Sequence, residues 1–246
     1  MIAARTTRVS YGFDAPYVLI GLGAVALGYL IALILVGIYG TALAFWVVAI
    51  ITIAMIAQVG LFLHSTRRGK FQVWSELLDR LALRGDERVL DLGPGRGAVL
   101  LAVARRLSTG RVVGIDLWRT IDQSGNSAEI TERNADACGV ADRVELCTGD
   151  MTALPFPDNE FDVVVSSLAI HNIKSATGRA AAVREALRVL RPGGRMVIAD
   201  ISKAPEYREV LSANGARDVT IEPLGWRMWF AGPWMSTSAV TATKPA

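Results

Sequence analysis

The stretch that decides the fold is Val89-Leu90-Asp91-Leu92-Gly93-Pro94-Gly95-Arg96-Gly97. An apolar run containing an acid leads into three glycines at alternate positions, and the apolar segment 98–107 follows. A strand that turns sharply into a helix needs residues without Cβ, because glycine adopts positive φ without strain. The bare backbone also lets a ligand approach the free N–H groups at the start of the helix. The stretch therefore predicts a strand–turn–helix with a ligand-binding turn, which several nucleotide-binding folds share.

Segments with the patterns of strands and helices alternate after this turn, and such alternation is typical of a parallel α/β sheet. A helix over 70–83 precedes the turn, with apolar residues at helical spacing. We expect strands at 88–92, 111–116, 143–148, 161–166 and 195–199, helices at 98–107, 127–138, 178–190 and 207–214, and closing strands at 219–223 and 236–243.

Acidic and polar residues follow the ends of three of these strands. Asp116 ends the second strand, Asp150 follows the third, and the stretch 166–172, which begins and ends with polar residues, extends from the fourth. Ligands of open α/β sheets bind beyond the carboxyl ends of the strands. Each acid alone could be a helix cap or a turn residue. Together they favour one nucleotide site, with Asp116 suited to ribose hydroxyls and Asp150 to an adenine amine.

With these motifs in place, residues 70–246 resemble the class I S-adenosylmethionine-dependent methyltransferases, especially the small-molecule group related to quinone-biosynthesis enzymes. The resemblance implies an α/β, Rossmann-like sheet of seven strands whose last strand is antiparallel, and S-adenosyl-L-methionine as the cofactor. The motifs that match in order are the glycine stretch 89–97, Gly114-Ile115-Asp116-Leu117, Gly149-Asp150-Met151, Phe161-Asp162-Val163-Val164-Val165-Ser166 and Leu190-Arg191-Pro192-Gly193-Gly194.

The resemblance also implies which residues hold the cofactor. The glycine turn would approach the amino-acid part, with Asp91 oriented toward its ammonium group, while Asp116 would hold the ribose. Leu117 would pack on the adenine, and Ser166 would line the methionine portion. The full predicted set is Asp91, Gly93, Pro94, Gly95, Gly97, Asp116, Leu117, Asp150, Met151 and Ser166.

Methyl transfer from a sulfonium is an in-line displacement, in which alignment of the acceptor supplies much of the acceleration. A base is needed only where the acceptor must lose a proton. His171 follows the fourth strand and is the candidate catalytic base; the alternative is that it only shapes the pocket. Trp118 could stack near adenine or cover the sheet edge. Trp226 and Trp229, in the aromatic stretch 225–234, could form an apolar substrate wall, lie at a membrane interface or pack in the core.

Two apolar stretches precede the domain. Residues 17–38 and 41–63 carry no charge, and each is long enough to cross a bilayer as a helix. The short break between them predicts an antiparallel transmembrane hairpin. A signal peptide is rejected because the first apolar region is longer than a usual h-region and a second apolar span follows it. Basic residues at Arg5, Arg8, Arg67, Arg68 and Lys70 flank it, which predicts an integral membrane protein with both termini and the methyltransferase domain in the cytoplasm.

The hairpin also carries small residues every fourth position, at Ala24, Gly28 and Ala32. Such a stripe allows close helix packing, within the hairpin or in a homodimer. The domain organisation we expect is a cytoplasmic segment over 1–16, the hairpin over 17–63, a linker over 64–70 and the methyltransferase domain over 71–246.

Charge and cysteine content exclude other classes. Residues 1–70 hold five basic residues against one acid, and the remainder holds 21 basic against 22 acidic residues. The globular part therefore has no nucleic-acid footprint. Cys138 and Cys147 fit neither a metal spacing nor a disulfide framework, so no metal is expected.

The sequence therefore favours a membrane-anchored methyltransferase acting on an apolar or lipid-like small molecule, such as a quinone or phenol. One alternative is a catalytically inactive membrane scaffold with the same fold. A second is an NAD-type dinucleotide-binding protein, because Gly93-x-Gly95-x-x-Ala98 with Asp116 fits that fingerprint. The second alternative leaves Asp150-Met151 and the turn at 191–194 unexplained.

Overall fold

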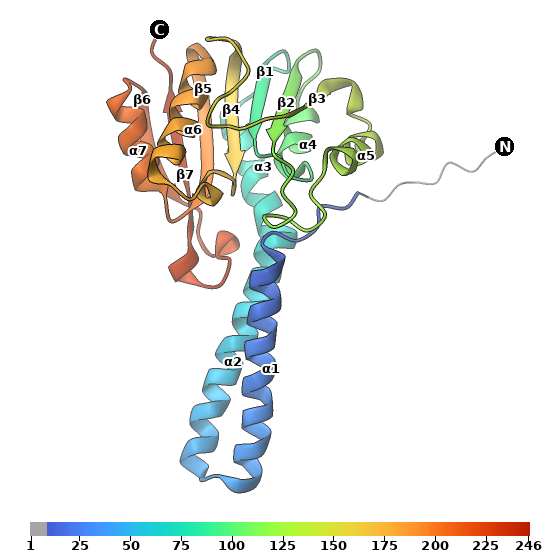
Figure 1. Cartoon of the computed structure of the whole chain (residues 1–246), viewed down its shortest axis with the longest axis vertical. Helices are drawn as coiled ribbons and strands as arrows, with labels where there is room; N and C mark the ends of the chain where they lie inside the picture. The colour runs from blue at the N-terminus through green and yellow to red at the C-terminus, as the bar shows by residue number, and fades with distance from the viewer. Residues whose placement is uncertain (1–8) are drawn as a thin grey trace, which may run out of the picture.

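A computed structural model describes residues 9–246, and it shows a helical hairpin projecting from an α/β domain (Figure 1). The hairpin consists of α1 (Pro16–Tyr39) and α2 (Ala42–His64). Arg5 and Arg8, the expected N-terminal basic flank, lie outside the described residues.

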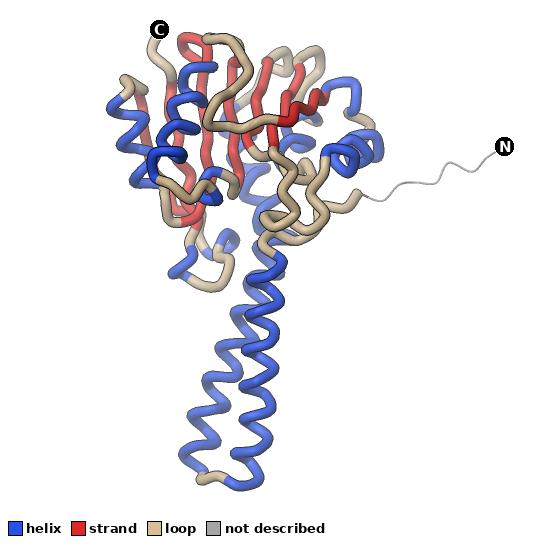
Figure 2. Tube along the Cα trace, in the orientation of Figure 1, coloured by secondary structure: helices blue, strands red, loops and turns tan. Residues whose placement is uncertain are grey.

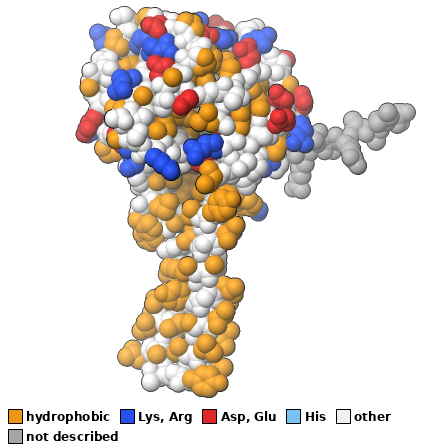
Figure 3. Space-filling view, in the orientation of Figure 1, with side chains coloured by type: hydrophobic (Ala, Val, Ile, Leu, Met, Phe, Trp, Pro, Cys, Tyr) orange, Lys and Arg blue, Asp and Glu red, His pale blue; other side chains and the backbone are white. Residues whose placement is uncertain are grey.

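The two hairpin helices are long and apolar enough to cross a membrane, and only 6% of the most apolar stretch of each is buried inside the structure. Hydrophobic side chains cover the visible face of the hairpin, whereas charged side chains gather on the α/β domain (Figure 3). Thr41 caps α2 by accepting a hydrogen bond from the Ala44 N–H (3.3 Å), and the Thr52 hydroxyl donates to the Tyr29 carbonyl across the hairpin (3.2 Å). These helices are therefore not the buried core of the α/β domain.

The α/β domain is built on a single seven-stranded sheet in the order β3-β2-β1-β4-β5-β7-β6 (Figure 2). Strands β1 to β5 run parallel, and β7 runs antiparallel to both β5 and β6. This arrangement confirms the expected fold class, including the antiparallel last strand. The strands are β1 (Arg88–Leu92), β2 (Arg111–Asp116), β3 (Val144–Thr148), β4 (Phe161–Ser167), β5 (Leu190–Ile201), β6 (Arg217–Pro223) and β7 (Thr237–Thr243).

Helices cover both faces of the sheet and bury two apolar clusters against it. Trp74 and Leu78 of one helix and Leu101 of the next belong to the first cluster, and Leu187 and Tyr207 belong to the second. Residues at helical spacing thus meet the β-branched strand residues, which stabilises the three-layer arrangement. The helices are α3 (Lys70–Leu81), α4 (Ala98–Ala104), α5 (Ala128–Cys138), α6 (Ala176–Val189) and α7 (Ala204–Ala213), with short turns η2 (Ala141–Arg143), η3 (Ile170–Asn172), η4 (Trp226–Met228) and η5 (Pro233–Met235).

The joint between hairpin and domain differs from the linker expected over 64–70. Residues Ser65–Gly69 form a helical turn, η1, that connects α2 to α3 without a break. The Ser65 hydroxyl donates to the Trp229 carbonyl (2.9 Å), and a Cβ at Gly69 would collide with the Arg227 carbonyl. Contact with the 226–229 turn therefore holds this segment helical, which local sequence does not reveal.

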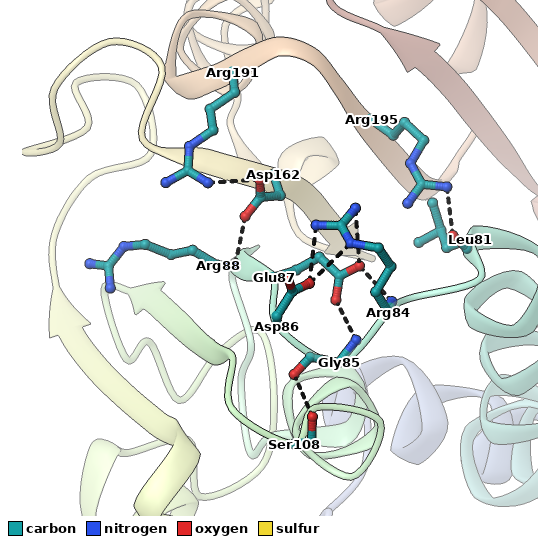
Figure 4. A network of polar contacts seen from close by, with 10 residues as sticks. All are labelled: Leu81, Arg84, Gly85, Asp86, Glu87, Arg88, Ser108, Asp162, Arg191 and Arg195. Carbon is teal, nitrogen blue, oxygen red and sulfur yellow. Dashed lines mark hydrogen bonds and ion pairs between the residues drawn. The ribbon is translucent and has the colours of Figure 1, made fainter.

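A polar network closes the amino ends of the strands (Figure 4). Glu87 accepts hydrogen bonds from the backbone N–H groups of Arg84 and Gly85. Asp162 accepts from the Arg88 N–H (2.8 Å) and from Arg191 (2.7 Å). Side chains of the protein thus fill the amino ends of the strands, whereas the carboxyl ends are open to a ligand.

Candidate functional site

A cavity of about 340 Å³ lies beyond the carboxyl ends of β1, β2 and β4. The acids at the ends of β2 and β3, Asp116 and Asp150, both line it, so the sequence-based expectation that they share one crevice agrees with the geometry. Of the predicted cofactor residues, those that line the cavity are Asp91, Gly93, Pro94, Gly95, Asp116, Leu117, Asp150 and Met151, and His171 lines it as well.

The glycine turn is held in a conformation that other residues avoid. Gly93 and Gly95 have φ values of +73° and +55°, in the left-handed region that favours glycine. The Gly95 N–H donates to the Asp116 carboxylate (3.0 Å), which ties the turn to the end of β2. A Cβ at Gly93 would collide with the Ala169 side chain, and one at Gly95 with the Gln123 side chain. The turn therefore offers bare backbone to the cavity.

Asp91 is the least satisfied carboxyl group of this cavity. Its side chain is 1% exposed, and within residues 9–246 neither carboxylate oxygen has a hydrogen-bond partner. Burial, followed by the nearby charge of Asp116, raises the pKa of Asp91 to about 8. A cationic group in the cavity would supply the missing partner.

His171, in η3, is held by an acid at the end of β5. Its ring Nδ1 lies 2.5 Å from Asp200 Oδ1, and its backbone N–H donates to Asp200 Oδ2 (2.9 Å). The Tyr207 hydroxyl donates to the same Oδ2 (2.9 Å). Burial alone would lower the pKa of His171, but the hydrogen bond and charge of Asp200 outweigh it, so the pKa of His171 is raised. Nε2 is the ring nitrogen that remains for a ligand.

Asp200 and Tyr207 were not predicted as site residues. The available signal was weak: Asp200 is one more acid close to the carboxyl end of a strand, as Asp116 is. Its pairing with His171 depends on a contact across 29 positions of the chain. A single sequence does not specify which groups meet at that distance.

Residues 9–15, called here the N-terminal strap, lie against the loop 117–126, called here the cofactor loop. The Asp14 carboxylate lies 2.7 Å from the Lys70 ammonium, and it also accepts from Gln123 (3.0 Å). Gln123 in turn accepts from the Arg96 N–H of the glycine turn (2.7 Å). Lys70 is only 4% exposed, so it is not part of a basic flank at a membrane surface, as the sequence had suggested. Its charge is used in a buried ion pair.

Two predicted cofactor residues do not line the cavity. Gly97 has φ +87°, and a Cβ there would crowd Leu101 and Thr131. The Ser166 hydroxyl is fully buried and donates to the Leu92 carbonyl (2.9 Å). Gly97 therefore shapes the start of α4, and Ser166 links β4 to β1.

The three predicted substrate tryptophans also lie outside the cavity wall. The Trp118 indole N–H donates to the Thr148 hydroxyl (2.9 Å) at the end of β3. Trp226 stacks on His64 with ring centroids 4.8 Å apart, and its side chain is 55% exposed. Trp229 contributes its carbonyl to the Ser65 contact. The cavity is instead lined by Phe230 of the same aromatic stretch and by Met235, which directly follows that stretch.

Comparison with known sequences gives a consistent result. The family described as "Methyltransferase domain" matches residues 90–198. The ubiquinone/menaquinone biosynthesis C-methyltransferase UbiE of Roseobacter denitrificans is 36% identical over 138 residues, 56% of this chain and 52% of that protein. The UbiE protein of Pseudomonas putida is 33% identical over 162 residues, 65% of this chain and 59% of that protein. The matched region thus spans little more than half the length of these relatives.

Solved structures share the fold. The [4+2]-cyclase SpnF superposes with a TM-score of 0.57 at 24% identity, covering 70% of this chain and 82% of that one. Geranyl diphosphate C-methyltransferase from Streptomyces coelicolor, solved with Mg²⁺, geranyl diphosphate and S-adenosyl-L-homocysteine, has a TM-score of 0.56 at 19% identity and covers 70% and 77% of the two chains. At these identities the likeness concerns the fold.

The match of residues 90–198 to a methyltransferase domain and the seven-stranded sheet together support a class I S-adenosylmethionine-dependent methyltransferase. Within that class, the chain is similar in sequence to the quinone-biosynthesis C-methyltransferases. The cofactor is S-adenosyl-L-methionine, and the cavity fits it. The partnerless Asp91 carboxyl can receive the ammonium group, the bare turn at Gly93 and Gly95 admits close approach, and Asp116 and Asp150 supply acceptors for hydroxyl and amine groups.

Proposed function

We propose that this protein is a membrane-anchored methyltransferase that transfers a methyl group to an apolar or lipid-like acceptor of the quinone or phenol type. One observation carries the proposal. The cavity that holds the cofactor motifs is also lined by Val18 of α1 and Phe62 of α2. The acceptor side of the cavity is thus built partly from the apolar hairpin, which favours an acceptor from the membrane.

The hairpin supports the anchoring part of the proposal. A helix of 24 residues is about 36 Å long at 1.5 Å per residue, enough for a hydrocarbon core of about 30 Å. Arg67 and Arg68, both exposed, lie where α2 meets the domain. By the positive-inside rule, this end and the methyltransferase domain face the cytoplasm.

Dimerisation through the hairpin is a further expectation. Gly28 and Ala24 of the small-residue stripe are exposed, and a Cβ at Gly28 would meet nothing within 4 Å. These two residues of the stripe are therefore not buried by the contact between α1 and α2. Crosslinking of the full chain in vesicles, compared between wild type and Gly28→Leu, tests whether a second copy packs there.

The residues of the cavity divide into a cofactor set and an acceptor set. Asp91, Asp116 and Asp150 hold the cofactor at one end, and when bound there S-adenosyl-L-methionine supplies a methyl group on a sulfonium, open to in-line displacement. His171 accepts the proton of the acceptor hydroxyl on Nε2, while Asp200 holds Nδ1–H and stabilises the imidazolium that forms. Removal of that proton makes the acceptor oxygen, or the ring carbon conjugated to it, nucleophilic.

The test is transfer of radiolabelled methyl groups from S-adenosylmethionine to membrane-lipid extracts by the full chain in phospholipid vesicles. We expect label in an apolar fraction, lost in Asp116→Asn and retained in Asp79→Asn, an exposed acid remote from the cavity. Calorimetry separates the alternatives: binding of S-adenosylhomocysteine without methyl transfer to any fraction favours a scaffold. Binding of NAD but not of S-adenosylhomocysteine would overturn the proposal.

A further inference from the structure

The mouth of the cavity has an apolar rim. Val18, Leu117 and Ile121 line the cavity and are nevertheless 40%, 52% and 57% exposed. Large apolar side chains gathered at one opening mark a surface that meets another apolar phase or partner. Val18 lies in the first turn of α1, where the helix leaves the domain, so this opening is at the base of the hairpin (Figure 1).

A second element completes the opening. Residues 225–235, called here the Trp-rich loop, project from the sheet toward α2 (Figure 1). Phe230 packs edge-to-face on Phe62 with centroids 5.7 Å apart, and Arg227 forms an ion pair with Glu76 (2.5 Å). These contacts hold the loop against the helices, and its Phe230 and Met235 line the cavity.

The same loop exposes tryptophan toward the outside. Trp226 and Trp234 are 55% and 65% exposed, and Trp226 stacks on His64 at the end of α2. Tryptophan is favoured at the membrane–water interface because its ring is apolar and its N–H is polar. The exposed tryptophans and the apolar rim therefore lie near the same end of the hairpin, where lipid would end and the domain would begin.

We propose that the acceptor reaches the cavity sideways from the bilayer, through an opening between the first turn of α1 and the Trp-rich loop. The hairpin is then a wall of the acceptor site as well as an anchor. The acceptor is an amphipathic lipid whose ring-sized polar head reaches His171, while its apolar tail passes Val18 and Met235 into the lipid. This inference rests on the proposed function, since it assumes that the hairpin lies in a membrane.

The apolar tail of the acceptor is the physical reason for such a route. Each methylene group drawn from lipid into water is unfavourable, so a long-tailed acceptor stays in the bilayer unless the protein offers continuous apolar surface. Val18, Phe62, Phe230 and Met235 offer that surface between the hairpin and the cavity. The paired charges of Lys70 and Asp14 already satisfy each other there, so they place no free charge on the path.

The test uses the full chain in phosphatidylethanolamine–phosphatidylglycerol vesicles with a hydroquinone probe that carries a ten-carbon tail and a terminal diazirine. Photolabelling and peptide mapping are compared among wild type, Val18→Trp and Val25→Trp. Val25 is also on α1 and 49% exposed, but it does not line the cavity. Binding of S-adenosylhomocysteine to all three confirms that they fold.

We expect the tail to label the first turn of α1 and the Trp-rich loop. Labelling should fall about tenfold in Val18→Trp, because small changes of size in an apolar pocket alter recognition by that order, and should be unchanged in Val25→Trp. Equal labelling in all three proteins, or labelling spread evenly along the hairpin, would overturn the proposal. Methyl transfer to a membrane lipid with equal labelling would refute the opening and leave the activity intact. Localised labelling without methyl transfer would refute the activity and leave the opening.

Discussion

Replacement of Asp200 by asparagine tests how His171 works. The carboxylate is 1% exposed and contacts the ring Nδ1, the His171 N–H and the Tyr207 hydroxyl. Asparagine keeps the shape but removes the charge that stabilises the imidazolium. A hydrogen bond to a charged group contributes about 1.5–3 kcal/mol, so kcat should fall about 10- to 100-fold. His171→Ala should lower kcat by about 100-fold or more and leave affinity for S-adenosylhomocysteine nearly unchanged.

The direction of the pH effect follows from the raised pKa of His171. Only the neutral ring accepts a proton, so wild-type kcat should rise with pH through a pKa above the ordinary value of 6.5. In Asp200→Asn, the charge that offsets burial is gone, so the pKa of His171 should fall. The acidic limb of the profile of kcat against pH should then move to lower pH by about one unit. The variant should therefore be least impaired at acidic pH. The charged or titratable groups that act on this pair are Asp122, Lys203, Tyr207 and Arg179, and Glu206 acts on the last two.

The measurement is kcat against pH with saturating cofactor, using the acceptor fraction identified by radiolabelling. Asp79→Asn removes an exposed carboxylate outside the cavity and should leave both kcat and the profile unchanged. Tyr207→Phe should give a smaller shift in the opposite direction, because Asp200 loses a donor and keeps its full charge toward His171. Loss of kcat with an unmoved profile would assign Asp200 a purely structural role. Unaltered turnover in His171→Ala would remove the base.

Three other predictions concern cofactor binding and stability. Because the pKa of Asp91 is raised to about 8, binding of a cation should ionise it, and calorimetry near pH 7 in buffers of different ionisation enthalpy should show proton release that Asp91→Asn abolishes. The raised pKa of Asp91 destabilises the folded state only above the ordinary pKa of 3.8. In urea titrations of the cofactor-free protein, Asp91→Asn should therefore raise the free energy of unfolding by about 1–3 kcal/mol at pH 8. Below pH ~4 the free energy of unfolding should be unchanged. Gly93→Ala should abolish S-adenosylhomocysteine binding, whereas Gly139→Ala, with a similar positive φ but open space around it, should lower stability alone; equal loss of binding would contradict the steric argument. Lys70→Met should lower the free energy of unfolding by about 1–3 kcal/mol, because Asp14 loses its cation and keeps only the Gln123 donor, and adding Asp14→Asn should recover part of it.

The order of elements and the location of the cofactor cavity could be predicted from sequence because both depend on local patterns. Glycines at 93 and 95 are required by positive φ at those positions, and the acid at 116 is the last residue of its strand. Apolar periodicity identified the sheet-covering helices in the same way, and the antiparallel strand over 236–243 followed from the family resemblance. The helical joint at 65–69 escaped prediction because its cause is a contact with a turn more than 150 residues away.

The acceptor side of the cavity was harder to predict for the same reason. The aromatic composition of 225–234 suggested an apolar wall or an interface. It could not distinguish the side chains that line the cavity from those that face outward. In the structure Trp226 faces outward on His64, while Phe230 faces the cavity against Phe62. That division depends on how the loop folds over the end of α2, and composition does not encode it.

Lys70 shows that the role of a charge at the base of the hairpin also depends on distant contacts. Counted by sequence, it adds to the basic flank of the hairpin; in the structure, its buried ion pair with Asp14 joins the N-terminal strap to α3. Gln123 extends that link to the glycine turn through the Arg96 N–H. The connection from the start of α1 to the cofactor turn is therefore continuous and polar, while Val18 carries the apolar wall beside it. A change in how α1 leaves the domain would disturb both ends of the cavity, so we expect substitutions at the start of α1 to affect cofactor binding as well as the acceptor side.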